Sequence, residues 1–184
     1  MRQSVLVRYG AIPEVARFEC DWPEPPARGE TVVVETDRGT ELGSVLDKFR
    51  ETGPQASMTT EDKHPQTAFR LIRLATSNDE RLSEQLWVSA NDEFTQWCER
   101  IRAWQLDLEL IDLEWTLDRE KLILYVVNDR GPECTKLAIQ ASIAGLRPVH
   151  VQPVDDQGVV RVQQCGCGTS GNGCCSDREE ALPG

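Results

Sequence analysis

A run of apolar residues at helical spacing, starting near position 80, is the feature that most constrains how this chain folds. Successive apolar residues are separated by 4, 4, 4, 3, 4 and 3 positions, which is the spacing of one face of an α-helix. The pattern predicts one long helix over about residues 78–104. Ser77 and Glu80, three positions apart, predict a capping box at its start, which satisfies free backbone N–H groups. The predicted buried face consists of Leu82, Leu86, Ala90, Phe94, Trp97, Ile101 and Trp104.

Segments of strand character lie on both sides of this helix. Residues 69–74 precede it, and residues 106–117 follow it with apolar residues at every second position. The alternation slips by one position at Ile111, which predicts a β-bulge. A turn at residues 118–121 then leads into the apolar run 122–127, and together these segments predict the strongest hairpin of the chain.

The order of elements beyond this hairpin suggests a known topology. Pro132 suits the first turn of a second helix, which is expected to end near Gly145. Residues 149–152 and 159–162 predict a final hairpin. The resulting order β-α-β-β-α-β is that of the ferredoxin-like arrangement. Residues 67–164 are therefore predicted as one α+β domain.

The N-terminal part of the chain has a different character. Several short, β-branched segments occur within residues 1–50 and predict a small β unit resembling a barrel or curled antiparallel sheet. Gly43 within one of these segments predicts a bulge or a close backbone approach. Residues 51–66 are polar and contain glycine and proline, so they are expected to form a linker or loop. The predicted fold class is therefore α+β, with two units followed by a cysteine-rich tail over residues 165–184.

The cysteine-rich tail is the strongest candidate for a chemical site. Four of the seven cysteines of the chain lie within eleven residues, among glycines and polar residues that cannot bury a thiol in a core. Clustered thiolates are ligands for iron–sulfur clusters and for zinc, although this spacing is less regular than that of common zinc sites. A redox-active or disulfide-forming tail and an inert tail are the alternatives. The candidate metal ligands are Cys165, Cys167, Cys174 and Cys175.

Charge and apolar patterning limit the partners and the location that we expect. The net charge of −11 and the lack of a basic stripe argue against direct binding of DNA or RNA, which proteins hold mainly through Lys and Arg. The sequence has no apolar run of signal-peptide or membrane-helix length. We therefore expect a cytoplasmic protein with reduced thiols, without a membrane partner.

Other reactive residues have ordinary interpretations. Cys20, Cys98 and Cys134 are expected to be packing thiols, and two histidines so far apart as His64 and His150 give little support to a histidine zinc site. No Gly-x-Ser-x-Gly elbow and no phosphate-binding loop occurs in the sequence. The acidic row Glu109, Asp112 and Glu114 is expected to lie mainly on a solvated face.

The segment Val32-Val33-Val34-Glu35-Thr36-Asp37-Arg38-Gly39-Thr40-Glu41-Leu42-Gly43-Ser44-Val45 consists of a Val-rich strand followed by an Arg-Gly and a Glu-x-Gly pattern. This segment resembles the bacterial YaaT/RicT-like regulator family, whose conserved C-terminal region is shared with a yeast polymerase-suppressor protein. The resemblance runs over about residues 3–130 and is clear again around residues 104–114 and 118–122. Beyond this region the family's cysteine motif is present only in a stretched form, as Cys165-Gly166 and Cys174-Cys175. The chain is thus expected to be a divergent, shortened member.

The resemblance implies a cytosolic regulator or adaptor and no enzymatic activity. Family members form a complex with two small helical proteins, RicA and RicF, and that complex carries iron–sulfur clusters and influences messenger RNA processing through an endoribonuclease. The resemblance implies an iron–sulfur cluster as the cofactor, held by this chain alone or shared with a partner, and zinc is the alternative. Arg38, Gly39 and Glu41 are candidate partner contacts, with a purely structural hairpin as the other interpretation. A zinc-stabilised structural module and a thiol redox protein that uses the tail cysteines are the alternative functions.

Overall fold

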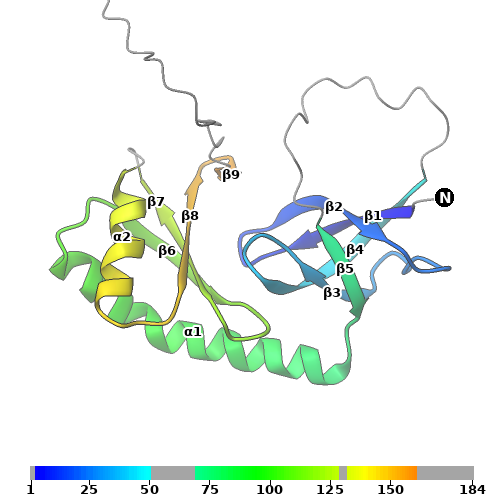
Figure 1. The fold of residues 1–184 in the computed structure, drawn as a ribbon, viewed down its shortest axis with the longest axis horizontal. Coiled ribbons are helices and arrows are strands. Elements are labelled where there is room, and N and C mark those ends of the chain that lie inside the picture. The colour runs from blue at the N-terminus through cyan, green and yellow to red at the C-terminus, as the bar shows by residue number, and fades with distance from the viewer. Residues whose placement is uncertain (1–2, 51–68, 129–131, 161–184) are drawn as a thin grey trace, which may run out of the picture.

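The computed structural model describes residues 3–50, 69–128 and 132–160. These residues form a mixed α+β structure with two sheets and two helices, which confirms the predicted fold class at this level (Figure 1). No helix in these ranges is long and apolar enough to cross a membrane. The tail cysteines Cys165, Cys167, Cys174 and Cys175 lie outside the described residues.

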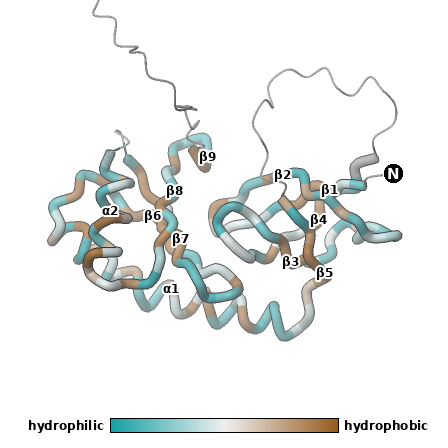
Figure 2. The backbone as a smooth tube through the Cα atoms, viewed as in Figure 1, coloured by the Kyte–Doolittle hydropathy of each residue, from teal (hydrophilic) through white to brown (hydrophobic). Residues whose placement is uncertain are grey.

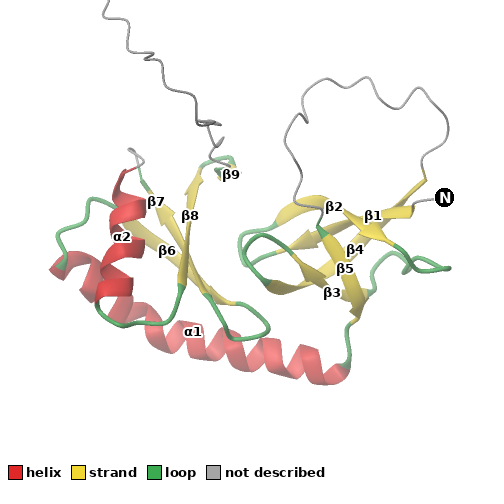
Figure 3. Ribbon diagram, viewed as in Figure 1, coloured by secondary structure: helices red, strands yellow, loops and turns green. Residues whose placement is uncertain are grey.

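The N-terminal unit is a closed five-stranded barrel with the strand order β1-β2-β5-β3-β4 (Figure 3). Its strands are β1 (Gln3–Tyr9), β2 (Glu14–Cys20), β3 (Thr31–Glu35), β4 (Thr40–Arg50) and β5 (Arg70–Leu74). Neighbouring strands pair antiparallel except β2 and β5, which pair parallel through Glu19 and Arg70. Closure leaves no free edge that could pair with another chain.

The barrel interior is filled by alternate residues of its strands, because successive side chains of a strand point to opposite faces. Val5 and Val7 of β1, Phe18 of β2, and Val32 and Val34 of β3 have no exposed surface. Gly43 of β4 lies so close to β1 that an added Cβ would be 2.3 Å from Val7 Cγ1. The close backbone approach predicted at Gly43 is therefore confirmed.

The position of β5 differs from the sequence-based expectation. Residues 69–74 were assigned to the second unit as its first strand, but β5 pairs with β3 and β2 and thereby completes the barrel. Val32 pairs with Leu74 and Glu35 with Arg70. A short strand carries no mark of the sheet that it joins, and here the barrel needs a fifth strand to close.

Helix α1 (Ser77–Ala103) follows β5 and runs along both units (Figure 1). Its bounds match the predicted helix, but its capping box is formed by Thr76 and Asp79, one position before the predicted pair. Asp79 also binds Arg73 at 2.6 and 2.9 Å, which ties the end of β5 to the helix start. The first half of α1 packs on the outside of the barrel through Leu86 and Val33, so this one helix joins the two units.

The second sheet has the order β6-β7-β8-β9. Its strands are β6 (Glu109–Trp115), β7 (Leu122–Val127), β8 (Val149–Asp155) and β9 (Gly158–Val159), and α2 (Pro132–Ile143) connects the parallel strands β7 and β8. β6 and β7 form the predicted hairpin, and their register shifts between Leu110 and Asp112, which confirms the bulge at Ile111. β8 and β9 form the predicted last hairpin. Because β5 belongs to the barrel, the described part of this unit lacks the leading strand of a ferredoxin-like arrangement.

Strand β7 is buried on both faces, and the alternation of its side chains divides the core into two layers. Leu122, Leu124 and Val126 pack with residues of α1 and α2. Ile123 and Tyr125 point the other way and pack with Ile12 of the barrel unit. Figure 2 shows the apolar run of β7 between the helices and the barrel. The second sheet therefore packs against the helices on one face, and on the other face its strand β7 meets the barrel unit at Ile12.

Candidate functional site

The two units meet at the tight turn between β3 and β4, which is the Asp37-Arg38-Gly39 segment singled out by the sequence. The backbone N–H of Leu117 donates to the Thr40 carbonyl at 2.7 Å, which links this turn to the end of the β6 segment. Gly39 has φ +143, and an added Cβ would lie 3.0 Å from Thr116 Cγ2. Glycine is thus required both by the backbone angle and by the close contact with the second unit.

Arg38 extends from this turn into the interior and is 1% exposed. Its Nε and Nη2 donate to the two carboxylate oxygens of Glu41 at 3.1 and 2.8 Å, the bidentate geometry that guanidinium and carboxylate groups favour. Nη1 lies 3.1 Å from Glu14 Oε1 and also donates to the hydroxyl of Tyr125 at 3.1 Å. The guanidinium carbon is 5.0 Å from the centre of the Tyr9 ring. One side chain thus connects strands of the barrel with β7.

The hydrogen bonds continue from Tyr125 into β6. The Tyr125 hydroxyl donates to Glu114 Oε2 at 2.7 Å, and the backbone N–H of Ala11 donates to the same oxygen at 2.8 Å. On the barrel side, the Thr36 hydroxyl donates to Glu41 Oε1 at 2.6 Å. We refer to Glu14, Thr36, Arg38, Glu41, Glu114 and Tyr125 as the Arg38 cluster.

One cation faces three carboxylates in this buried cluster, and the pKa values respond accordingly. Burial raises the pKa of Glu41 to about 7, although the charge of Arg38 and the bonds from Thr36 and Arg38 act in the opposite direction. Burial and the neighbouring Glu114 raise the pKa of the Tyr125 hydroxyl, which therefore stays protonated and able to donate. Burial disfavours the charge of Arg38, but Glu41, Tyr125, Glu14 and Glu114 together raise its pKa.

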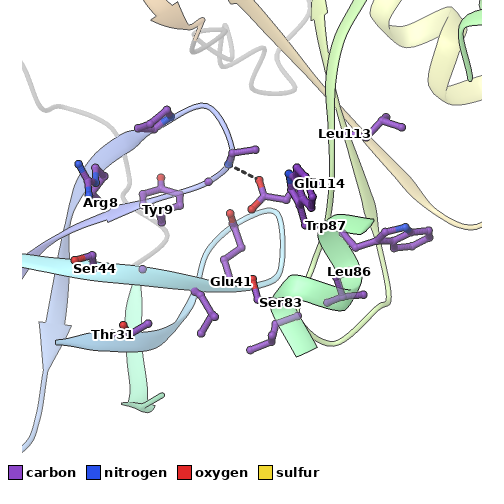
Figure 4. Close-up of a pocket in the computed structure, with 17 residues that line it drawn as sticks. Arg8, Tyr9, Thr31, Glu41, Ser44, Ser83, Leu86, Trp87, Leu113 and Glu114 are labelled. Atoms are coloured by element: carbon purple, nitrogen blue, oxygen red, sulfur yellow. Dashed lines mark hydrogen bonds between the residues drawn. The ribbon is translucent and has the colours of Figure 1, made fainter. Parts of the chain in front are cut away.

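A cleft of about 330 Å³ lies beside this cluster, between the barrel, α1 and β6 (Figure 4). Glu41 and Glu114 contribute carboxylates to its wall. Ser83, Leu86 and Trp87 line it from α1, and Trp87 is 66% exposed. The remaining lining residues are Arg8, Tyr9, Gly10, Ala11, Pro13, Thr31, Leu42, Gly43, Ser44, Leu113, Trp115 and Leu117.

The hydrogen bonding of the cleft determines which chemistry it can support. Both oxygens of Glu41 are engaged by Arg38, and Oε2 of Glu114 already accepts two bonds. Among the described residues, neither Ser44 nor Ser83 bonds to a carboxylate or an imidazole that could activate it. The cleft therefore offers a largely apolar binding surface whose lining also includes Arg8 and the already bonded carboxylates of Glu41 and Glu114, and its described residues form no assembled pair of nucleophile and base.

The structure brings Arg38, Gly39 and Glu41 together, but at the contact between the units of this chain. Arg38 and Glu41 are 1% and 2% exposed, in accord with the structural interpretation of the motif. A direct contact of these two side chains with a partner stays a prediction.

Cys20 is buried, and Cys98 and Cys134 pack against the main helix–sheet core, as expected for packing thiols. Glu109 is exposed, whereas Glu114 is drawn into the Arg38 cluster.

Sequence reasoning missed Tyr125, Glu14 and the role of Glu114. Tyr125 lies in the apolar run of β7, where its single hydroxyl was the only signal of a polar contact. Glu14 lies at the start of β2 and gave no signal at all.

Within the described residues no group of three or more His, Cys, Asp or Glu side chains is arranged to hold a metal. His64 lies outside the described residues, and burial lowers the pKa of His150 on β8.

Comparison of the chain with protein-family models, with curated proteins and with solved structures found no match. The resemblance to the YaaT/RicT-like family therefore rests on the sequence motifs alone, and membership of the family stays a prediction.

Proposed function

We propose that this chain is a non-enzymatic regulatory adaptor, in which a rigid two-unit body binds a protein partner and a cysteine-rich segment binds an iron–sulfur cluster or zinc. The observation that carries the proposal is the exposed Trp87 at the edge of the cleft. The carboxylates of that cleft, Glu41 and Glu114, are already hydrogen-bonded to Arg38 and Tyr125. Exposed tryptophans beside apolar clefts are typical anchors of protein interfaces. The motif resemblance supports the same class of function.

The chemistry of the cleft favours one kind of occupant. Leu86, Trp87 and Leu42 supply apolar contacts, and Glu114 adds a carboxylate to the wall. Glu80 and Glu84 are exposed on the same end of α1, where they outnumber the exposed Arg81. An amphipathic helix with apolar residues on one face and lysine or arginine at its border would complement this surface. The small helical proteins of the RicA and RicF type, which the resemblance implies, are proposed as the partners, and RNA processing as the process they influence.

The Arg38 cluster connects the two units of the body. Arg38 links barrel and sheet directly, and α1 packs against both. A partner that contacts α1 and the barrel together would thus meet a surface whose two parts are joined by packing and hydrogen bonds. This arrangement lowers the entropy that is lost on binding.

Binding of a RicA-type and a RicF-type protein to the purified full chain, measured by isothermal titration calorimetry, tests the partner proposal. Trp87→Ala should weaken binding by about tenfold or more, since interface tryptophans commonly contribute over 1 kcal/mol. Val88→Ala is the matched control, because Val88 is the next residue of α1, is 51% exposed and does not line the cleft. Equal loss in both variants, or in neither, contradicts docking at the cleft.

The metal proposal is tested separately by anaerobic purification followed by iron, sulfide and zinc analysis. Replacement of Cys174 and Cys175 by Ser should abolish the bound metal, whereas Cys134→Ser should not. The double tail variant should unfold at nearly the wild-type temperature, because the described core lies outside residues 165–184. Full metal content in the double variant would contradict the ligand assignment. Zinc without sulfide would favour the structural-module alternative.

A further inference from the structure

A second cavity, of about 160 Å³, lies between the C-terminal half of α1 and the start of β8. Trp97, Trp115, Leu122, Leu146 and Val149 form its apolar wall. A space of about this volume is large enough for a benzene-sized ring. Glu93, Arg100 and Arg147 also line it, so that charged groups border an apolar space.

Each of the two guanidinium groups at this cavity lies over a tryptophan ring. Arg100 lies over the ring of Trp97 with its Cζ 5.0 Å from the ring centre, and Arg147 lies 5.6 Å from the centre of Trp115. Their weak hydrogen bonds go to neutral oxygens, from Arg100 to Gln96 at 3.4 Å and from Arg147 to the Arg119 carbonyl at 3.3 Å. Among the described residues neither forms an ion pair with a carboxylate.

Glu93 does not neutralise this pair. Its Oε1 accepts the indole N–H of Trp115 at 3.1 Å. With one carboxylate and two guanidinium groups, the cavity carries an excess of one positive charge in a chain whose net charge is −11. An anion is therefore attracted to this place although the protein as a whole repels it.

The indole N–H of Trp97 is a further unmet donor. Trp97 is 3% exposed, and its Nε1 has no hydrogen-bond partner among the described residues. Buried donors without a partner are rare in folded proteins. Trp97 lines the cavity, so its indole N–H signal reports on what occupies that space.

We propose that this cavity is a binding site for a small organic oxyanion, a carboxylate or phosphate ester attached to a ring-sized apolar group. The oxyanion would lie between Arg100 and Arg147, whose planar guanidinium groups match carboxylate and phosphate oxygens. The apolar part would contact Leu122, Leu146 and Val149. Trp115 borders both this cavity and the cleft, but the proposal does not depend on the adaptor function.

Titration of the full chain with benzoate and with phenyl phosphate, followed by the indole N–H signals in NMR spectra, tests the site. We expect saturable shifts of the Trp97 and Trp115 signals, and the relative affinity of the two probes separates a carboxylate from a phosphate site. Benzamide, a neutral analogue of benzoate, should bind at least about tenfold more weakly, because it lacks the charge. Inorganic phosphate should bind more weakly than phenyl phosphate, because it lacks the apolar part.

Arg100→Gln and Arg147→Gln should each weaken anion binding by at least about tenfold. Arg102→Gln is the matched control, since Arg102 is exposed near the same helix end and does not line the cavity. Val149→Phe fills the cavity without removing a charge and should also abolish binding, which keeps the test valid if an arginine variant fails to fold. Unshifted Trp97 and Trp115 signals at about 10 mM of either anion, equal binding of benzamide, or unchanged affinity in both arginine variants would overturn the proposal.

Discussion

The guanidinium of Arg38 donates a hydrogen bond to the hydroxyl of Tyr125 at 3.1 Å, across 87 positions of the sequence. Arg38 lies on a turn of the barrel and Tyr125 lies in the central part of the second sheet. This bond joins the two units at a point where both side chains are inaccessible to solvent. The energetics of the Arg38 cluster should therefore be measurable as the stability of the whole body.

Replacing Arg38 by Met should lower the free energy of unfolding by about 3–5 kcal/mol, since it leaves the buried Glu41 without its counter-ion. Urea denaturation followed by tryptophan fluorescence measures the loss. The double variant with Glu41→Gln should lose less than the sum of the two single variants, because the uncompensated charge is then removed as well. A loss below about 1 kcal/mol in Arg38→Met would contradict a stabilising role of the cluster.

The pH dependence of stability should reveal the raised pKa of Glu41. Its pKa is about 7 in the folded chain against 4.5 for the free group. Between these values the folded chain holds a proton that the unfolded chain has released, so this contribution to the unfolding free energy falls as pH rises. His150, whose pKa is lowered by burial, contributes a slope of opposite sign below its ordinary pKa.

The difference in unfolding free energy between wild type and Glu41→Gln separates the two groups. From pH 5 to pH 8 the unfolding free energy of the wild type should fall by about 1–3 kcal/mol relative to that of the variant, because the glutamine side chain has no proton to lose. Denaturant unfolding at both pH values provides the measurement. A difference that stays constant, or that shifts in favour of the wild type, would mean that Glu41 is ionised throughout.

Gly43→Ala should destabilise the barrel by about 1–3 kcal/mol, because the new Cβ would overlap Val7 Cγ1 at 2.3 Å. Thermal unfolding of the variant checks this value, with Ser44→Ala as the control on the same strand. In a Val7→Ala background the added cost of Gly43→Ala should shrink, since the clashing methyl group is gone. If Gly43→Ala costs as much stability in the Val7→Ala background as in the wild type, the cost arises from the backbone and not from the Val7 side chain.

Truncation of the two tryptophans of α1 should change stability to very different extents. Trp97 is 3% exposed, and Trp97→Ala should cost about 3–5 kcal/mol of stability. Trp87 is 66% exposed, and Trp87→Ala should change stability by about 0.5 kcal/mol or less. Chemical denaturation of the two variants side by side is the test. Similar losses of stability in the two variants would mean that Trp97 does not lie on the buried face of α1.

The isolated chain should not bind single-stranded RNA with submicromolar affinity at about 150 mM salt, because a net charge of −11 provides few cations to displace condensed counter-ions. Fluorescence polarisation with a labelled generic RNA measures this directly. Submicromolar binding would point to a direct role at RNA in place of the adaptor role.

Local patterns in the sequence were sufficient to predict much of this protein. The spacing of apolar residues predicted α1 to within about one residue at each end, and the slip in alternation located the bulge at Ile111. Gly43 signalled a close approach of two strands. These features depend on neighbouring residues and on the period of helix or strand, which the sequence carries directly.

Tertiary structure alone decided which surfaces meet. β5 has the same strand character whether it joins the barrel or the second sheet, and barrel closure by pairing with β3 settled the matter. Arg38 reads as a polar turn residue, yet the apposition of the barrel and β7 buries it against Glu41, Glu14 and Tyr125. Likewise, Arg100 and Arg147 are 47 positions apart by their numbering and border one cavity only because α1 packs on the second sheet. Burial and charge pairing depend on such long-range contacts, and no local period of the sequence encodes them.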